Sequence, residues 1–218
     1  VIGHGSYYVK FCYGTVPVDE QGTAFFKAPA GVELYFIALD EDGKEIRRMG
    51  TVTQITDGEI QSCIGCHESR FQSPYVSQSH VMNRLADKPD TITPPAWGAG
   101  PVSFVKQGQP VLDKYCITCH SGKSPKARLD LSGEKSRFYN MAYRSLVDRK
   151  LVEYYYINKG PTGTFQPFQS GSWVSKLTQI IESKHSDVDM DEQDRRRIYS
   201  WIDANIPYYD TWDISRPH

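Results

Sequence analysis

The hydrophobic pattern of the chain changes once along its length. From Ser6 to about Ile55, β-branched and aromatic residues occur in short runs separated by turn-forming residues, a pattern typical of antiparallel strands. The expected strands are Thr23–Phe26, Glu33–Leu39 and Lys44–Arg48. The acidic run Asp40–Asp42 lacks the twelve-residue ligand pattern of a calcium loop, so we interpret it as a hairpin turn. This part predicts a small antiparallel β-sandwich, or a piece of one, over residues 1–58.

After Gln61 the apolar residues follow a helical period. The helical stretches that we expect are Phe104–Tyr115, Met141–Tyr156, Trp173–Lys184 and Asp191–Asn205. A proline-rich connector, Thr93–Pro101, and a loop, Gly160–Gly171, interrupt this part. The sequence therefore predicts an α+β chain in which a β-sandwich domain at 1–58 precedes a mainly α-helical domain at 59–218.

Composition and charge narrow the class of protein. The 218 residues are 39% hydrophobic and 23% charged, and no apolar run is long enough to span a membrane. The 25 basic and 26 acidic side chains are interspersed, so no basic face indicates binding to nucleic acid or to an anionic membrane surface.

Two Cys-x-x-Cys-His units carry the chemistry. They are Cys63–His67 and Cys116–His120, and they use four of the five cysteines. Two thiols at this spacing on a tight turn can each add to one of the two vinyl groups of a porphyrin, and the histidine that follows can ligate the iron. We therefore predict two covalently bound haem c groups, attached by Cys63, Cys66, Cys116 and Cys119, with His67 and His120 as the proximal ligands.

The cysteine pairs have two other interpretations, a redox disulfide and a zinc site. A Cys-x-x-Cys pair is also found in redox disulfides, and two such pairs can form a zinc site. A histidine directly after both pairs, in a chain with only six histidines, favours haem.

The motifs also bear on location. Haem is joined to thiols outside the cytoplasm in bacteria, so we expect the chain to be periplasmic or otherwise exported. The sequence opens without a signal peptide, so we expect it to be a mature or truncated form. The fifth cysteine, Cys12, lies among strand-forming residues, and we expect a buried and unreactive thiol.

The distal ligands remain to be assigned. The histidines outside the motifs are His4, His80, His185 and His218. For the second haem the candidates are His185 and Met190, which both lie between the last two predicted helices.

Several segments resemble the hydrazine synthase alpha subunit and its relatives. The resemblance runs from about residue 14 to 210, and it is carried by Gly14–Val18, Gly22–Phe26, Ala38–Gly43, Ser62–Glu68, Pro94–Gly98, Gln109–Asp113, Cys116–His120, Leu129–Leu131, Ser175–Leu177 and Trp201–Tyr209. It implies a dihaem cytochrome c module, and it implies His185 rather than Met190 as the second distal ligand. It does not imply hydrazine chemistry.

The resemblance does not assign the distal ligand of the first haem. In the family a tyrosine four residues after the proximal histidine is the distal group, and here that position is Phe71, which cannot ligate. Either another side chain fills the site, with His80 first and Tyr75, Met82 or His4 behind it, or the iron is five-coordinate.

From these observations we expect an electron carrier that transfers single electrons, alone or as a module of a larger redox system. Its partners would be redox proteins or other subunits of a multihaem complex. The alternative is a haem enzyme or sensor whose first iron is open to a small nitrogen compound or peroxide. The residue over the first iron separates the two.

Overall fold

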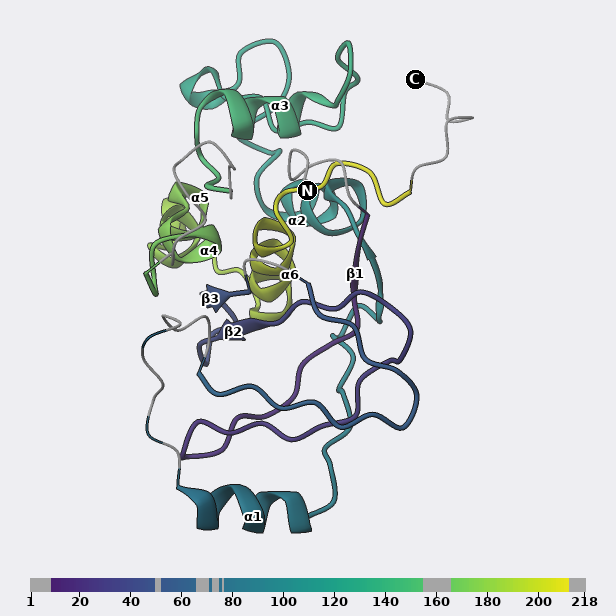
Figure 1. Ribbon diagram of the computed structural model, residues 1–218. Coiled ribbons are helices and arrows are strands. Elements are labelled where there is room, and N and C mark those ends of the chain that lie inside the picture. Colours follow the sequence, from purple (N-terminus) through teal and green to yellow (C-terminus); the bar gives the residue numbers. More distant parts are fainter. Residues whose placement is uncertain are drawn as a thin grey trace.

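A computed structural model describes residues 9–49, 52–65, 71, 75, 77–154 and 166–211. Within these ranges, most helices lie around the C-terminal helix, whereas the helix Gln78–Ala86 lies apart at the bottom of the view (Figure 1). The elements in chain order are β1 (Lys10–Cys12), β2 (Ile37–Leu39), β3 (Glu45–Arg48), α1 (Gln78–Ala86), β4 (Gly100–Val102), the π-helix η1 (Phe104–Gly108), α2 (Gln109–Tyr115), the 3₁₀ turn η2 (Lys126–Arg128), α3 (Met141–Asp148), α4 (Gly171–Val174), α5 (Lys176–Glu182), the 3₁₀ turn η3 (His185–Asp187) and α6 (Glu192–Asp203). The predicted mixture of helices and antiparallel strands is confirmed.

Helix α6 is the centre of the core. Asp191 caps it by accepting a 2.8 Å hydrogen bond from the N–H of Asp194, and acidic residues in its first turn suit the helix dipole. Ile198, Trp201 and Ile202 recur at helical spacing and are fully buried. Phe104 of η1 packs on Trp201 with ring centroids 4.9 Å apart. Each buried aromatic or branched side chain contributes about 1.5 to 3 kcal/mol.

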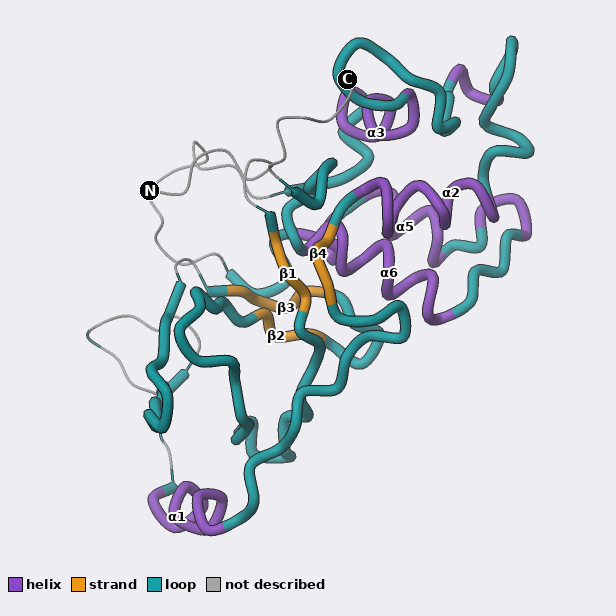
Figure 2. The backbone as a smooth tube through the Cα atoms, turned by 90° about the vertical axis from the view of Figure 1, so that its right-hand side faces the viewer, coloured by secondary structure: helices purple, strands orange, loops and turns teal. Residues whose placement is uncertain are grey.

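The strands form two separate two-stranded antiparallel sheets. Strand β1 pairs with β4, and β2 pairs with β3 (Figure 2). The predicted strand at Lys44–Arg48 is confirmed, whereas Glu33–Leu39 shortens to β2 and Thr23–Phe26 contributes only a bridge from Phe26 to Asp90.

The predicted β-sandwich is not confirmed. A sandwich needs apolar faces that close on each other, but Leu34 is the only fully buried hydrophobic residue among the described positions 9–65. The backbone pairing also crosses the predicted boundary at residue 58. Residues of the proline-rich connector form β4, and Thr15 bridges to Thr93. The division into two domains therefore stays a prediction.

The helices predicted in the C-terminal part are confirmed, with shorter bounds. Met141–Tyr156 ends at Asp148, and Trp173–Lys184 is split into α4 and α5 at Ser175. The predicted loop Gly160–Gly171 lies largely outside the described residues. Cys12 is half-buried at the end of β1, and burial raises the pKa of its thiol, as expected for an unreactive cysteine.

No helix among the described residues is long and apolar enough to cross a membrane.

Candidate haem site

The second Cys-x-x-Cys-His unit forms a tight turn directly after α2. The N–H of Cys116 ends the helix by donating to the carbonyl of Leu112. The carbonyl of Cys116 then accepts from the N–H groups of Cys119, at 3.2 Å, and His120, at 3.0 Å. Two thiols and an imidazole therefore share one compact turn, as covalent attachment of a porphyrin requires.

The ring of His120 is oriented by backbone carbonyls. Its Nδ1 lies 3.1 Å from the carbonyl oxygen of Lys126 and 3.2 Å from that of Leu129. A carbonyl can only accept, so Nδ1 carries the proton that is shared between them. In a neutral imidazole this leaves the lone pair on Nε2, which is the atom that would bind a metal.

The ring of His185 lies near the ring of His120. The two ring centroids are 6.3 Å apart and the ring planes differ by 34°. Two imidazoles on opposite sides of one metal ion, each with its nitrogen about 2.0 Å from the ion, would have centroids roughly 6.3 Å apart. The structure thus brings together two of the residues that the sequence analysis selected, at a separation compatible with two ligands of one metal ion.

The turns around both histidines hold left-handed residues that are not glycine. Lys184, Ser186 and Asp187 flank His185 with φ between 49° and 60°. On the other side, Ala127 and Arg128 have φ of 55° and 54°, between the two carbonyls that face His120. Such conformations cost on the order of 1 kcal/mol or more each, and they concentrate at functional sites.

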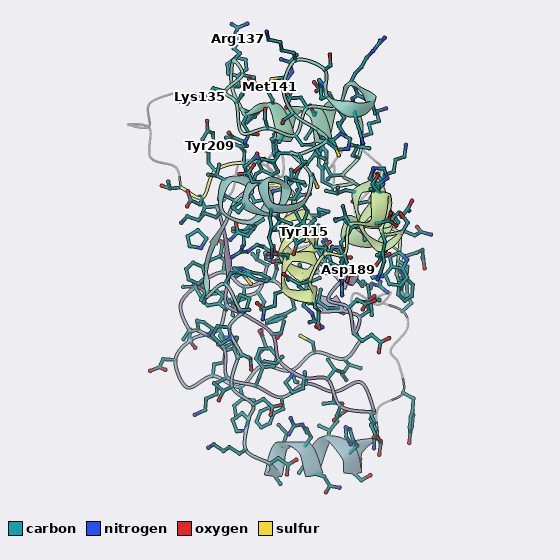
Figure 3. The ribbon with its side chains drawn as sticks, turned by 180° about the vertical axis from the view of Figure 1, so that it is seen from behind. Tyr115, Lys135, Arg137, Met141, Asp189 and Tyr209 are labelled. Atoms are coloured by element: carbon teal, nitrogen blue, oxygen red, sulfur yellow. The ribbon has the colours of Figure 1, made fainter. Side chains whose placement is uncertain are left out.

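The end of α2 is tied to the loop before α6. Asp191 accepts from the Tyr115 hydroxyl and from the Lys114 ammonium, both at 2.9 Å. The Lys114 contact is the main reason why the pKa of Asp191 lies well below its usual range. In Figure 3 Tyr115 and Asp189 are both labelled next to the yellow ribbon of α6. The loop that carries His185 is therefore anchored to the helix that carries Cys116.

Met190, the alternative second ligand, lies in the hydrophobic core. Its side chain is 4% exposed, and it lines a cavity with Lys44, Glu182 and Tyr199 between the β2–β3 turn, α5 and α6. No residue of the second motif is among the described residues that line this cavity. The position fits a packing role.

The geometry also bears on the two other interpretations of the cysteines. Burial, with the neighbouring Cys119, raises the pKa of the Cys116 thiol to about 11, whereas redox-active pairs have lowered thiol pKa values. Among the described residues no group of three or more His, Cys, Asp or Glu side chains could hold a metal ion. Haem iron needs only two protein ligands, because the porphyrin supplies the other four.

The first motif is only partly described. Cys63 is exposed, and Cys66, His67 and the candidate His4 lie outside the described residues. The other positions considered there, Phe71, Tyr75 and Met82, have exposed side chains.

His80, the favoured first distal ligand, is engaged elsewhere. Its Nε2 lies 3.1 Å from the Thr23 hydroxyl and 3.2 Å from a carboxylate oxygen of Asp19. Hydrogen bonds from the N–H groups of Thr23 and Gln21, together with the charges of His80 and Arg84, lower the pKa of Asp19. In this arrangement His80 joins α1 to the turn at residues 19–23.

Sequence reasoning did not single out the groups that support the site. These are Lys114 and Tyr115, the carbonyls of Lys126 and Leu129, and Arg149, which donates to the same turn. Every residue has a backbone carbonyl, so the residue type does not reveal which carbonyls accept from His120. The cations Lys114 and Arg149 have the composition and pattern of ordinary surface residues.

Comparisons with known proteins concern mainly the N-terminal part. Residues 1–68 match the family model described as the hydrazine synthase alpha subunit middle domain. The match supports a relation to hydrazine synthase over less than a third of the chain, and it ends just after the first motif. No curated protein and no solved structure matches the chain.

Proposed function

We propose that the chain is a dihaem c-type cytochrome that transfers single electrons, as a module of a larger redox system. The observation that carries the proposal is the pair His120 and His185, whose ring centroids lie 6.3 Å apart. The relation to hydrazine synthase over residues 1–68 supports a haem-related redox setting.

The residues around the second site have distinct roles in this proposal. Cys116 and Cys119 would attach the group, and His120 and His185 would hold the iron from its two faces. Bound haem would supply a centre that takes up and releases one electron. The carbonyls of Lys126 and Leu129 hold the proton on Nδ1 of His120, so Nε2 stays a ligand. Two strong-field ligands that are kept in both oxidation states minimise rearrangement during electron transfer.

The first motif extends the proposal to a second haem held by Cys63, Cys66 and His67. Covalent attachment would place the chain in the periplasm or outside the cell. The match to one subunit of a named synthase supports other subunits of a complex as partners, beside redox proteins.

Haem content tests the proposal directly. The pyridine haemochrome assay is expected to give two c-type haems per chain. Replacing Cys116 and Cys119 by alanine should remove one, and replacing Cys63 and Cys66 should remove the other. Stoichiometric zinc without haem would contradict the proposal at its root.

A second function is favoured by one observation. Because Nε2 of His80 contacts Asp19 and Thr23, the first iron would lack this ligand and could bind a small nitrogen compound or peroxide. Ferrous protein should then take up carbon monoxide at one haem, and His80→Ala should not change the amount bound. A native protein that excludes carbon monoxide until His80 is replaced would instead make His80 the ligand.

A further inference from the structure

We propose that Arg149 is a positioning residue for His120. It holds the turn at residues 126–129, whose carbonyls orient the ring of His120. This inference rests on the proposed function, because it concerns the histidine that would ligate the second haem. Arg149 follows the last residue of α3, and it is 29 positions away from His120 in the sequence.

The guanidinium of Arg149 binds two neighbouring carbonyls of the turn. Nη1 donates to the carbonyl of Ala127 at 3.1 Å, and Nη2 donates to the carbonyl of Arg128. The planar fork of arginine can bind both acceptors at once in a fixed geometry, which a lysine ammonium cannot do. No carboxylate forms an ion pair with Arg149 among the described residues. Its donors are therefore directed at the turn.

The turn needs such support because it is strained. Ala127 and Arg128 are consecutive left-handed residues, and neither is a glycine. Conformations of this kind persist where surrounding contacts hold them. The strained pair lies between Lys126 and Leu129, whose carbonyls accept from Nδ1 of His120. Arg149 thus fixes the segment that places both acceptors.

The effect on a bound haem has a definite sign. A well-placed acceptor on Nδ1 makes the imidazole a stronger donor, which stabilises the ferric state. Loosening the turn should weaken this hydrogen bond and make the midpoint potential more positive. Removing a positive charge near the iron, with no change in geometry, stabilises the ferric state and makes the potential more negative. Holding the turn and supplying a positive charge are thus two roles of Arg149 whose loss would shift the midpoint potential in opposite directions.

The test compares three variants of the full dihaem protein. Arg149→Gln removes the fork and the charge, Arg149→Lys keeps the charge, and Lys150→Gln removes a neighbouring charge whose side chain forms no hydrogen bond with the turn among the described residues. Redox titration should show one haem of Arg149→Gln shifted to a more positive potential, with a smaller shift of the same sign in Arg149→Lys. Lys150→Gln should shift to a more negative potential or not at all.

Electron paramagnetic resonance of the ferric protein gives a second readout. The g-values of a low-spin haem depend on the angle between its two imidazole planes, so one set should change in Arg149→Gln and stay unchanged in Lys150→Gln. Two variants with equal negative shifts and native g-values would overturn the inference and leave the haem proposal intact. Protein without haem at Cys116 and Cys119 would instead overturn the proposed function.

Discussion

At the scale of single residues, the proposed haem site depends on two histidines whose ring centroids lie 6.3 Å apart. His120 is held by two carbonyls, whereas His185 is exposed on a turn of left-handed residues, and its Nε2 contacts only the Ser186 hydroxyl, at 3.4 Å, among the described groups. In the proposed haem site, the weakly held His185 would be the ligand that an external molecule replaces.

Replacing His185 tests this assignment. His185→Ala should convert one haem from a low-spin to a high-spin spectrum, because the iron loses its sixth ligand. The matched control is Met190→Leu, which keeps the volume of a core side chain at a cost of less than about 1.5 kcal/mol and should leave both spectra unchanged. The reverse pattern in the absorption spectra would move the ligand to Met190.

At the scale of elements, a buried polar cluster joins the hairpin β2–β3 to α4 and α6. Glu45 is 0% exposed and forms an ion pair with Arg48. Asp203, 2% exposed, accepts from the N–H and the hydroxyl of Ser172 at 2.6 and 2.7 Å. Gly171 lies against the cluster, where a Cβ atom would come within 2.3 Å of an Asp203 oxygen. Here a positive φ and the lack of space both require glycine.

The carboxylates of Glu45 and Asp203 share the Arg48 cation in this cluster, which makes the stability of the fold depend on pH. Burial, and then the charge of Glu45, raise the pKa of Asp203 to about 7. The folded state therefore binds a proton that the unfolded state has released above about pH 4. Between about pH 4 and pH 7 this residue should lower the free energy of unfolding by up to about 1.4 kcal/mol per pH unit as the pH rises.

Urea unfolding across this pH range would measure the effect. Asp19, Glu59 and Asp191 have lowered pKa values and act in the opposite direction, so the slopes of two proteins must be compared. Asp203→Asn should be less stable overall because it disturbs the hydrogen bonds from Ser172. Its free energy of unfolding should nevertheless rise more steeply with pH than that of the native chain. The exposed control Asp57→Asn should keep the native slope, and equal slopes in all three would refute the assignment.

At the scale of the whole molecule, the net charge of −1 conceals an uneven distribution. Five exposed cations lie in the turn that faces His120 or close to it or to Arg149 in the sequence, and none forms an ion pair with a described carboxylate: Lys123, Lys126, Arg128, Arg149 and Lys150. Arg149 binds the turn, so the cations at the end of α3 and those on the turn lie side by side. A positive local potential should draw anions to this side of the second haem site.

Oxidation by ferricyanide, a trianion, should report this potential. The rate constant for the second haem should fall as ionic strength rises, because salt screens the attraction. The double variant Lys123→Glu with Lys126→Glu should react more slowly and lose most of this dependence. The same charge change at Lys27 and Lys88, exposed lysines away from this turn, should leave the stopped-flow rates near native. Equal effects of the two doubles would show that only net charge matters.

The sequence alone predicts those features that depend on interactions between residues close together in the chain. The Cys-x-x-Cys-His spacing is local chemistry, so residues 116–120 predict a haem-attachment turn without any knowledge of the fold. The helical periods of Phe104–Tyr115 and Asp191–Asn205 are local too, and the structure confirms both helices. The strands were predicted less well, because β1 pairs with β4 across about 90 residues and no local pattern records that partner.

The tertiary structure alone decided which groups meet. The sequence left His185 and Met190 as candidates for the second distal ligand, and the resemblance favoured His185. The fold buries Met190 in the core and leaves the ring centroid of His185 6.3 Å from that of His120. For the first haem the sequence ranked His80 ahead of the other candidate ligands and left a five-coordinate iron open, whereas the fold brings Asp19 and Thr23 to the Nε2 of His80. Ligand choice and hydrogen-bond partners are set by contacts between distant segments, and those contacts exist only once the hydrophobic core has fixed the elements in space.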